Sequence, residues 1–165
     1  MKILVLSDSH SALSFMRLCI ESVKPDAVIH LGDYYDDGET MQEEYPQLRF
    51  YRVPGNCDRY RASSVLAETL VETVDGVKLY MTHGHLHQVK MGTGALIKAA
   101  RQRGAAAALF GHTHIALCEQ LKDGMWLFNP GSCGYYGGSA GIIELLDGKI
   151  QSCRVIRQDD LEEMV

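Results

Sequence analysis

The fold of this chain is constrained most strongly by five short apolar runs, each followed at once by polar side chains. The runs at 2–7, 27–31, 49–54, 77–82 and 106–110 have the length of buried strands. The residues after them are Asp8-Ser9-His10, Gly32-Asp33, Gly55-Asn56-Cys57-Asp58, His83-Gly84-His85 and Gly111-His112-Thr113-His114. One such cluster is typical of an ordinary turn. Five of them predict convergence on one place, because ligands of open α/β sheets bind beyond the carboxyl ends of the strands.

Helical patterns lie in the sequence between these predicted strands. Apolar residues recur at spacings of three and four over 13–23, which predicts an amphipathic helix. Ser11 is expected to be its N-cap, and Lys24-Pro25 to end it. A short acidic helix is predicted over 39–45, and another helix over 95–103 with Gly104 as its terminating residue. The first half of the chain therefore alternates between strands and helices.

The second half of the chain is richer in strands. Asp75-Gly76 lies between the runs 69–74 and 77–81 and is the strongest short turn signal in the sequence, which predicts a hairpin. After Ala105 the pattern is purely β, with turns at 123–124 and 147–148. An alternating front and a strand-rich back predict two sheets packed together with helices outside.

Length and composition narrow the classes of function. A chain of 165 residues is expected to form one domain, over 1–165, with a sizeable core. Its net charge of -5 argues against stable partnership with nucleic acid but allows a small anionic substrate held by a metal. The sequence contains no run of eighteen apolar residues, so no membrane partner is expected. The apolar stretch before Ser7 is too short for the core of a signal peptide. The cysteines are odd in number without a C-x-x-C pair, which favours reduced thiols and a cytoplasmic location.

The polar residues at the strand ends form a chemically coherent set of metal ligands. The expected ligands are Asp8, His10, Asp33, Asn56, His83, His112 and His114. Carboxylates, an amide oxygen and imidazoles together suit Mn²⁺, Fe²⁺, Ni²⁺ or Zn²⁺ better than Ca²⁺ or Mg²⁺. Seven side chains are too many for one four-coordinate metal and fit two metals that share a carboxylate.

In this order, the motifs resemble those of calcineurin-like metallophosphoesterases. The motifs that match are Asp8-x-His10, Gly32-Asp33, Gly55-Asn56, His83-Gly84 and Gly111-His112-Thr113-His114. Gly-Asn-Cys-Asp, Thr-His-Gly-His and Asn129-Pro130-Gly131-Ser132 look most like the small bacterial and archaeal phosphodiesterase branch. The Vps29-type retromer subunit is similar but has an eroded site. The resemblance covers nearly the whole chain. It implies a single metallophosphoesterase domain with an α/β fold, a four-layer α/β/β/α sandwich of two mixed sheets flanked by helices.

The resemblance also implies a role for each ligand. Asp8, His10 and His114 are expected on one metal, Asn56, His83 and His112 on the other, and Asp33 bridging both. This explains why His112 and His114 lie two residues apart, since one serves each metal. Thr113 between them is expected to point away as packing. The expected cofactors are two divalent transition metal ions, with Mn²⁺ placed first and Ni²⁺, Fe²⁺ or Zn²⁺ as alternatives.

The activity implied by the resemblance is that of a dinuclear phosphodiesterase acting on a small phosphoester. A hydroxide held between the metals would attack phosphorus in line. A phosphomonoesterase is the alternative within this chemistry, and a non-catalytic scaffold like the retromer subunit is the alternative from another class. The intact ligand set argues against the scaffold. The sequence leaves open the natural substrate and the oligomeric state, a homo-oligomer included.

The sequence departs from the family at Cys57, where many members have a histidine that helps to protonate the leaving group. The thiol is a weaker match for that role, and a Cys-His hydrolase with Cys57 as nucleophile is a rival interpretation. His85 could also reach the substrate, so the expected catalytic residues are Asn56, Cys57, His83 and His85.

Several other polar or aromatic residues are expected outside the catalytic set. His30 is predicted to be a satisfied core histidine and His87 a surface residue, and Asp36, Asp37 and Glu39 to form a solvated loop and first helical turn. Gly131–Gly134 is expected to shape the pocket wall, while Tyr135-Tyr136 fits pocket, interface or plain surface.

Overall fold

Two five-stranded sheets form the centre of the protein in the computed structural model, which describes residues 1–58 and 66–163. One sheet has the order β10 (Lys149–Arg157), β9 (Ser139–Leu146), β1 (Lys2–Leu6), β2 (Ala27–His30) and β3 (Arg49–Arg52). The other has the order β4 (Thr69–Val74), β5 (Val77–Thr82), β6 (Ala107–Leu109), β8 (Trp126–Asn129) and β7 (Leu117–Gln120). Both are mixed, because β1, β2 and β3 are parallel, as are β5, β6 and β8, whereas the remaining pairs are antiparallel.

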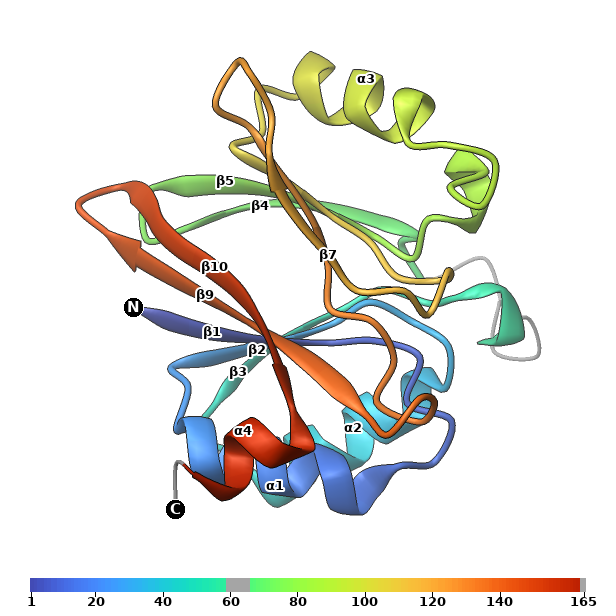
Figure 1. Ribbon diagram of the computed structural model, residues 1–165, viewed down its shortest axis with the longest axis vertical. Coiled ribbons are helices and arrows are strands. Elements are labelled where there is room, and N and C mark those ends of the chain that lie inside the picture. Colours follow the sequence, from blue (N-terminus) through green and yellow to red (C-terminus); the bar gives the residue numbers. More distant parts are fainter. Residues whose placement is uncertain (59–65, 164–165) are drawn as a thin grey trace.

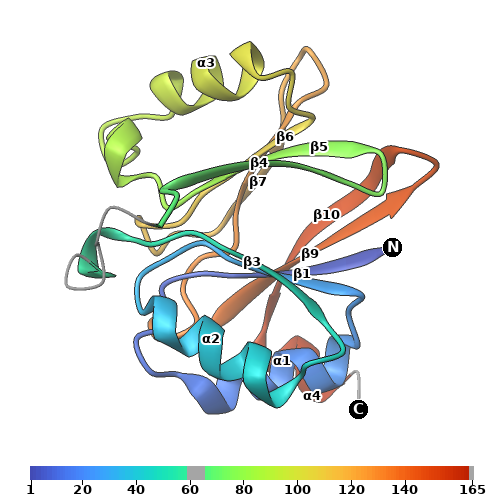
Figure 2. The same cartoon turned by 180° about the vertical axis from the view of Figure 1, so that it is seen from behind.

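Helices cover the outer face of each sheet. The helices α1 (Leu13–Val23), α2 (Tyr35–Glu44) and α4 (Gln158–Glu162) lie on the first sheet, and α3 (Gly94–Gln102) lies on the second (Figures 1 and 2). The four layers confirm the predicted α/β/β/α sandwich. None of the helices in the described residues combines the length and the hydropathy that a bilayer crossing requires.

Alternation along the strands builds three apolar cores. In β1, Ile3 and Val5 face the second sheet, whereas Leu4 and Leu6 face the helices. Neighbouring strand residues point to opposite faces, so a strand buried on both sides reads as a continuous apolar run. On the second sheet, Ala108 packs under α3 in the third core. This explains why the runs before the polar clusters contain so few polar residues.

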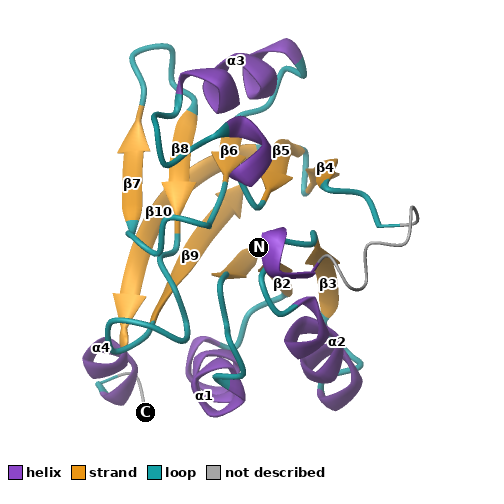
Figure 3. Cartoon of the chain, turned by 90° about the vertical axis from the view of Figure 1, so that its right-hand side faces the viewer, coloured by secondary structure: helices purple, strands orange, loops and turns teal. Residues whose placement is uncertain are grey.

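Parallel pairing places the polar clusters at one edge. The strands β1, β2 and β3 run in register and end together, and so do β5, β6 and β8 in the facing sheet (Figure 3). Backbone hydrogen bonds continue past the strand ends, from Asp8 N to Gly32 O at 2.9 Å and from Gly111 N to His83 O at 3.0 Å. The segments that follow the strands are therefore fixed by the sheets themselves.

The helix predictions were correct in place and partly wrong at the ends. The hairpin at Asp75-Gly76 is present, and α1 ends before Lys24, which is left-handed with φ 49°. Ser11 is not the N-cap of α1. Ala12 takes that position without a side-chain hydrogen bond, and Ser11 N donates instead to Asp37 Oδ2 at 2.8 Å. Asp37 is therefore buried rather than solvated, because α2 begins at Tyr35 and carries this carboxylate into the α1 turn.

The prediction of a purely β pattern after Ala105 was wrong at the C-terminal end. The helix α4 follows β10 directly, and Arg157 N donates to Asp160 Oδ2 at 2.7 Å at its start. Leu161 is fully buried against the α1 side of the first sheet. One buried apolar residue in five gives no recognisable period, so tertiary packing rather than pattern stabilises this helix.

His30 is the satisfied core histidine that was predicted. It is fully buried, accepts a hydrogen bond from Gly32 N at Nδ1 (3.3 Å) and lies 2.9 Å from Ser9 Oγ at Nε2. Burial lowers the pKa of this imidazole to about 4. The neutral ring is the form that the fold accommodates.

Burial of neutral His30 should make the folded protein less stable at acid pH. The unfolded chain binds the His30 proton near pH 6.5 and the folded chain only near pH 4, so the stability contributed by neutral His30 is present above pH 6.5 and is lost as the pH falls. Between pH 7 and pH 5 we expect His30 to account for a loss of about 2 kcal/mol in unfolding free energy. Urea denaturation of the wild type and His30→Gln at both pH values measures it. Equal losses in the two proteins would contradict the prediction.

Candidate metal centre

Four of the predicted ligands meet at the carboxyl edge of the sheets. Asp8 and His10 follow β1, Asp33 follows β2, and His114 follows β6, and one ligand atom from each lies within 4.8 Å of the others. Asp8 Oδ1 is 3.0 Å from His114 Nε2, and Asp33 Oδ2 is 4.0 Å from His10 Nε2. Both carboxylates are buried, with exposed fractions of 0% and 3%. This arrangement could hold one divalent cation.

The other three predicted ligands are Asn56, His83 and His112, of which His83 lies beside the other oxygen of Asp33. His83 Nε2 is 3.1 Å from Asn56 Oδ1 and 3.4 Å from Asp33 Oδ1. The rings of His83 and His112 are 5.0 Å apart. All seven residues predicted from sequence are thus brought together, in two groups that share Asp33.

Lone pairs in the cluster face one another without enough protons between them. The buried atoms Asp8 Oδ1 and His10 Nε2 accept or donate no hydrogen bond among the described residues. His83 Nδ1 lies 2.8 Å from the carbonyl oxygen of Leu31, which fixes the proton of the neutral ring on Nδ1. His83 Nε2 then points a lone pair at the two acceptor oxygens of Asn56 and Asp33. Buried acceptors of this kind require a partner, and a bound cation would provide one.

The backbone at the site is held in a conformation that side chains normally avoid. Five of the predicted ligands have positive φ: Asp8 (51°), His10 (44°), Asp33 (56°), His112 (68°) and His114 (60°). Each such residue costs about 1 kcal/mol or more, and strain of this kind is concentrated at functional sites. Hydrogen bonds from neighbouring segments must therefore hold these five residues in this conformation, which directs their side chains toward the site.

Two glycines permit the close approach of chain segments at the site. A Cβ atom at Gly55 would overlap the Asp33 carboxylate, and one at Gly111 would overlap Ser7 Oγ and lie 2.6 Å from Asp8 Oδ2. The glycines of the sequence motifs therefore serve packing beside the carboxylates.

Replacement of Gly111 by alanine should displace Asp8 and the His112 backbone. We expect the affinity for Mn²⁺ to fall by roughly 10- to 100-fold, as for other changes that misplace a metal ligand. The matched control is Gly94→Ala, because Gly94 also has an ordinary backbone conformation and a Cβ there meets open space. Calorimetric titration with Mn²⁺ compares the two, and equal affinities would show that the close contact at Gly111 is unimportant.

Hydrogen bonds from residues next to the ligands hold the ligands in place, and the sequence alone did not reveal these bonds. Asp8 Oδ2 accepts from Ser7 Oγ at 2.5 Å and from His112 N at 3.0 Å, so Asp8 links the two sheets. Asp58 is buried and accepts from Gly55 N at 2.7 Å and from Tyr35 N at 2.9 Å. It thereby ties the loop carrying Asn56 to the start of α2.

The turn after β8 supports the same site from the second sheet. Asn129 Nδ2 donates to Gly111 O and to Thr113 Oγ1, both at 3.0 Å. Thr113, expected only to pack, therefore helps to fix the turn that presents His112 and His114. Ser132 Oγ donates to Asp8 O at 2.8 Å, so the Gly131–Gly134 segment braces the end of β1.

The charges of the cluster favour deprotonated ligands at neutral pH. Burial, followed by the neighbouring His83, lowers the pKa of His112 to about 4. Burial acts to raise the pKa of Asp8, but the contacts with His114, His83 and Ser7 outweigh it and lower the pKa. The Asp8 contact raises the pKa of His114. The shifts of Asp8 and His112 favour the deprotonated state that metal binding needs, whereas the raised pKa of His114 favours its protonated form.

The expected catalytic residues Cys57 and His85 border the second group of ligands. Cys57 N donates to Asp33 Oδ1 at 2.9 Å, and its thiol is exposed. Partial desolvation, together with the Asp33 carboxylate, raises the pKa of this thiol to about 11. That leaves little thiolate and argues against the rival Cys-His hydrolase. The His85 ring lies 5.5 Å from that of His83 and 6.1 Å from that of His112.

His87 and the two adjacent tyrosines differ in their relation to the site. His87 is partly exposed, and its Nε2 lies 2.9 Å from the Tyr80 hydroxyl, so this predicted surface residue also packs against β5. Tyr135 stacks on His114, with ring centroids 4.8 Å apart and 17° between the planes, and Tyr34 lies 4.9 Å from His10. Tyr136 points outward and is 79% exposed. Tyr34 and Tyr135 therefore form an aromatic rim on the first group of ligands.

Comparison with known proteins agrees with this geometry. The sequence profile of the calcineurin-like phosphoesterase superfamily domain matches residues 1–148. The probable metallophosphoesterase YsnB of Bacillus subtilis is 33% identical over 135 residues, which cover 80% of this chain and 75% of that protein. A phosphodiesterase of Methanocaldococcus jannaschii is 27% identical over 171 residues, covering 94% and 98%.

A solved structure supports the same relationship. A protein of Streptococcus pneumoniae described as a predicted phosphoesterase superposes with a TM-score of 0.74 at 25% identity, covering 96% of this chain and 90% of that one. Vps29 of Entamoeba histolytica in complex with Zn²⁺ shares the fold, with a TM-score of 0.67 at 23% identity over 95% and 99% of the chains. The paired ligand groups, the strand order and the matching profile place the chain in one family: it belongs to the calcineurin-like phosphoesterase superfamily, the metallophosphoesterases.

Proposed function

We propose that this protein is a phosphodiesterase that binds two divalent transition metal ions, with Mn²⁺ as the first choice. The observation that carries the proposal is the division of seven side chains into two groups that share the buried Asp33 carboxylate. The first position would be held by Asp8, His10, Asp33 and His114, and the second by Asp33, Asn56, His83 and His112. The phosphodiesterase of M. jannaschii, similar over nearly its whole length, supports the choice of substrate class.

The residues around the two metal positions have separate roles in this proposal. When bound, the two cations would polarise a phosphoryl oxygen and supply a nucleophile at neutral pH. Asp33 keeps its two oxygens directed to different groups of histidines, and Leu31 O holds His83 with Nε2 available. Asn56 Nδ2 faces Cys57 Sγ at 3.7 Å, so the amide presents Oδ1 to the site.

The substrate is expected to enter from the side of the half-buried ligands. Asp8, Asp33 and His83 form the buried floor, while His10, Asn56, His112 and His114 are partly exposed. Cys57 and His85 lie beside the second group, where either could meet a leaving group. An exposed thiol with a pKa near 11 is a poor proton donor, which makes His85 the better-placed acid for a substrate that needs one.

The experiment that tests the function is a metal-dependent assay on paired substrates. Protein stripped with a chelator and reloaded with Mn²⁺ should hydrolyse bis(4-nitrophenyl) phosphate with a higher kcat/KM than 4-nitrophenyl phosphate. A preference for the monoester would favour the phosphomonoesterase. No hydrolysis of either substrate by protein shown to contain metal would favour a scaffold.

Replacement of His114 by alanine should distinguish the two metal positions. His114 belongs to the first group alone, so we expect titration with Mn²⁺ to show one binding event near the wild-type affinity and one weakened by at least roughly tenfold. The wild type should bind two ions per chain. Elemental analysis after gel filtration checks the stoichiometry, and weakening of both events in parallel would contradict the division of the ligands into two groups.

A further inference from the structure

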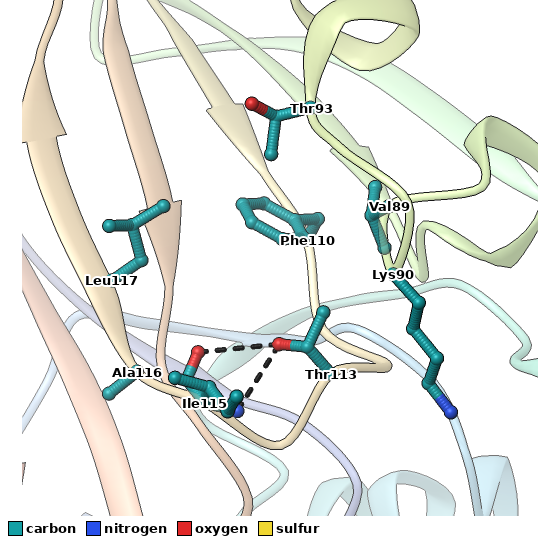
Figure 4. A pocket seen from close by; sticks show the side chains of 8 residues that line it. All are labelled: Val89, Lys90, Thr93, Phe110, Thr113, Ile115, Ala116 and Leu117. Atoms are coloured by element: carbon teal, nitrogen blue, oxygen red, sulfur yellow. Dashed lines mark hydrogen bonds between the residues drawn. The ribbon is translucent and has the colours of Figure 1, made fainter.

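An apolar groove of about 390 Å³ opens beside the proposed metal centre. Its lining includes Val89, Thr93, Phe110 and Leu117, which Figure 4 shows around a common space. Phe110 and Val89 belong to the core under α3, so the floor of the groove is fixed by packing. The volume lies at the lower end of the range for small-molecule sites and suits one aromatic ring better than a large ligand.

The groove and the metal centre share a wall. Thr113 lines the groove and lies in sequence between the proposed ligands His112 and His114. Its side chain is fixed by Asn129 Nδ2 at 3.0 Å and by Ile115 N at 3.2 Å, as part of the turn described above. A molecule whose phosphoryl group sits at the metals can therefore extend an attached group over Thr113 into the groove.

The positively charged side chain of Lys90 lies at the mouth of the groove. Lys90 is one of the residues that line the groove, and in Figure 4 its side chain extends away from Phe110. None of the described carboxylates forms an ion pair with Lys90. An ammonium with no ion-pair partner in the described part of the chain, beside an apolar groove, fits a ligand that joins an anion to an apolar group.

We propose that this groove binds an aromatic ester group of the phosphoester substrate, with Lys90 beside the phosphoryl oxygens. The inference rests on the proposed function for the position of the phosphoryl group and adds the chemical class of the substrate, an aryl phosphodiester or a diester with a similarly small planar group. Burial of one ring should favour the aromatic compound over its methyl counterpart by about tenfold or more in affinity.

The test uses two phosphonates that cannot be hydrolysed, because their carbon–phosphorus bond replaces the ester. Calorimetry on Mn²⁺-loaded protein should give phenylphosphonate a Kd about tenfold lower than that of methylphosphonate. Thr93→Phe places a ring in the groove and removes no cap, because Thr93 makes no side-chain hydrogen bond at the start of α3. We expect this variant to bind both phosphonates equally, at the wild-type affinity for methylphosphonate. Leu117→Thr, which keeps a strand-forming residue, should reduce the preference for phenylphosphonate about threefold.

Matched controls separate the groove from general effects on folding. Met91→Phe adds the same ring two residues away, at a position that is 88% exposed and outside the groove lining, and should keep the full preference. Lys90→Gln should weaken both phosphonates alike, by roughly two- to fivefold, whereas Lys98→Gln on α3 should change neither. Thermal denaturation of each variant verifies that it is folded.

The outcomes separate this inference from the proposed function. A wild-type preference below twofold, or a preference that survives Thr93→Phe, would overturn the groove. A preference that disappears in Thr93→Phe and persists in Met91→Phe would support it. Failure to hydrolyse diesters, in protein that shows this pattern of phosphonate binding, would overturn the phosphodiesterase and leave the aromatic binding site in place.

Discussion

Asp33→Asn should remove metal from both positions at once. Asp33 directs a different oxygen toward each group, with Oδ2 4.0 Å from His10 Nε2 and Oδ1 3.4 Å from His83 Nε2, whereas Asp8 approaches His83 Nε2 through Oδ1 alone, at 3.9 Å. An amide keeps the size of the side chain but offers a single neutral acceptor oxygen, so it can neither bridge two cations nor balance their charge. We expect the affinity for Mn²⁺ to fall at least about 100-fold at both positions, which exceeds the loss in His114→Ala.

The effect on activity should be larger still, because hydrolysis requires both positions to be filled. We expect kcat/KM for bis(4-nitrophenyl) phosphate to fall by roughly 10³-fold or more. Thermal melts give an independent measurement. Mn²⁺ should raise the Tm of the wild type and leave that of Asp33→Asn unchanged, since a ligand stabilises only the folded state that binds it.

Asp37→Asn is the matched control for this substitution. Asp37 is also a buried carboxylate on the segment after β2, but it accepts a hydrogen bond from Ser11 N, which an asparagine oxygen can also accept. Metal content and activity should stay near wild type in this variant. If Asp33→Asn retained two metal ions per chain, Asp33 would not be the bridging ligand and the division into two groups would be wrong.

The sequence was informative where local pattern and global fold agree. The strands that end at the site are mainly apolar because the sheets are covered on both faces, and five polar clusters at their ends were too many to explain as ordinary turns. That is why the positions of these strands along the chain and the convergence of seven residues could be predicted before their geometry was known. The glycines beside Asp33 and Asp8 followed from the same motifs.

The predictions failed where a residue takes its role from a distant segment. Ser11 has the residue type of an N-cap, but Asp37 from α2 occupies its N–H, and nothing near Ser11 in the sequence indicates this. Asp58 and Asn129 were noted only as members of sequence motifs, and only the folded chain shows that they fix the loops that carry Asn56 and His112. Local propensity decides such positions only when tertiary contacts do not.

Cys57→His should change how the enzyme responds to the leaving group. The backbone N–H of residue 57 is fixed by Asp33 Oδ1 at 2.9 Å, so the position of the side chain is set by the metal centre and a histidine there should face the same space. The thiol, with a pKa near 11, donates its proton poorly at neutral pH, whereas an imidazole with a pKa near 6.5 is matched to that role. A positioned general acid contributes about 10²- to 10⁴-fold when the leaving group needs a proton.

The expected result is therefore a selective gain. An alkoxide leaves poorly without a proton, so Cys57→His should raise kcat/KM for a diester with an alkyl leaving group by about 100-fold and for bis(4-nitrophenyl) phosphate by less than about threefold. Cys57→Ser is the matched control, because a hydroxyl has the size of the thiol but is no better as an acid. The measurement is the slope of log kcat/KM against the pKa of the leaving group in all three proteins at saturating Mn²⁺. The slope should flatten in Cys57→His alone. An unchanged slope in Cys57→His, together with a steeper one in His85→Ala, would show that His85 already donates the proton and that the thiol at residue 57 has no part in the step.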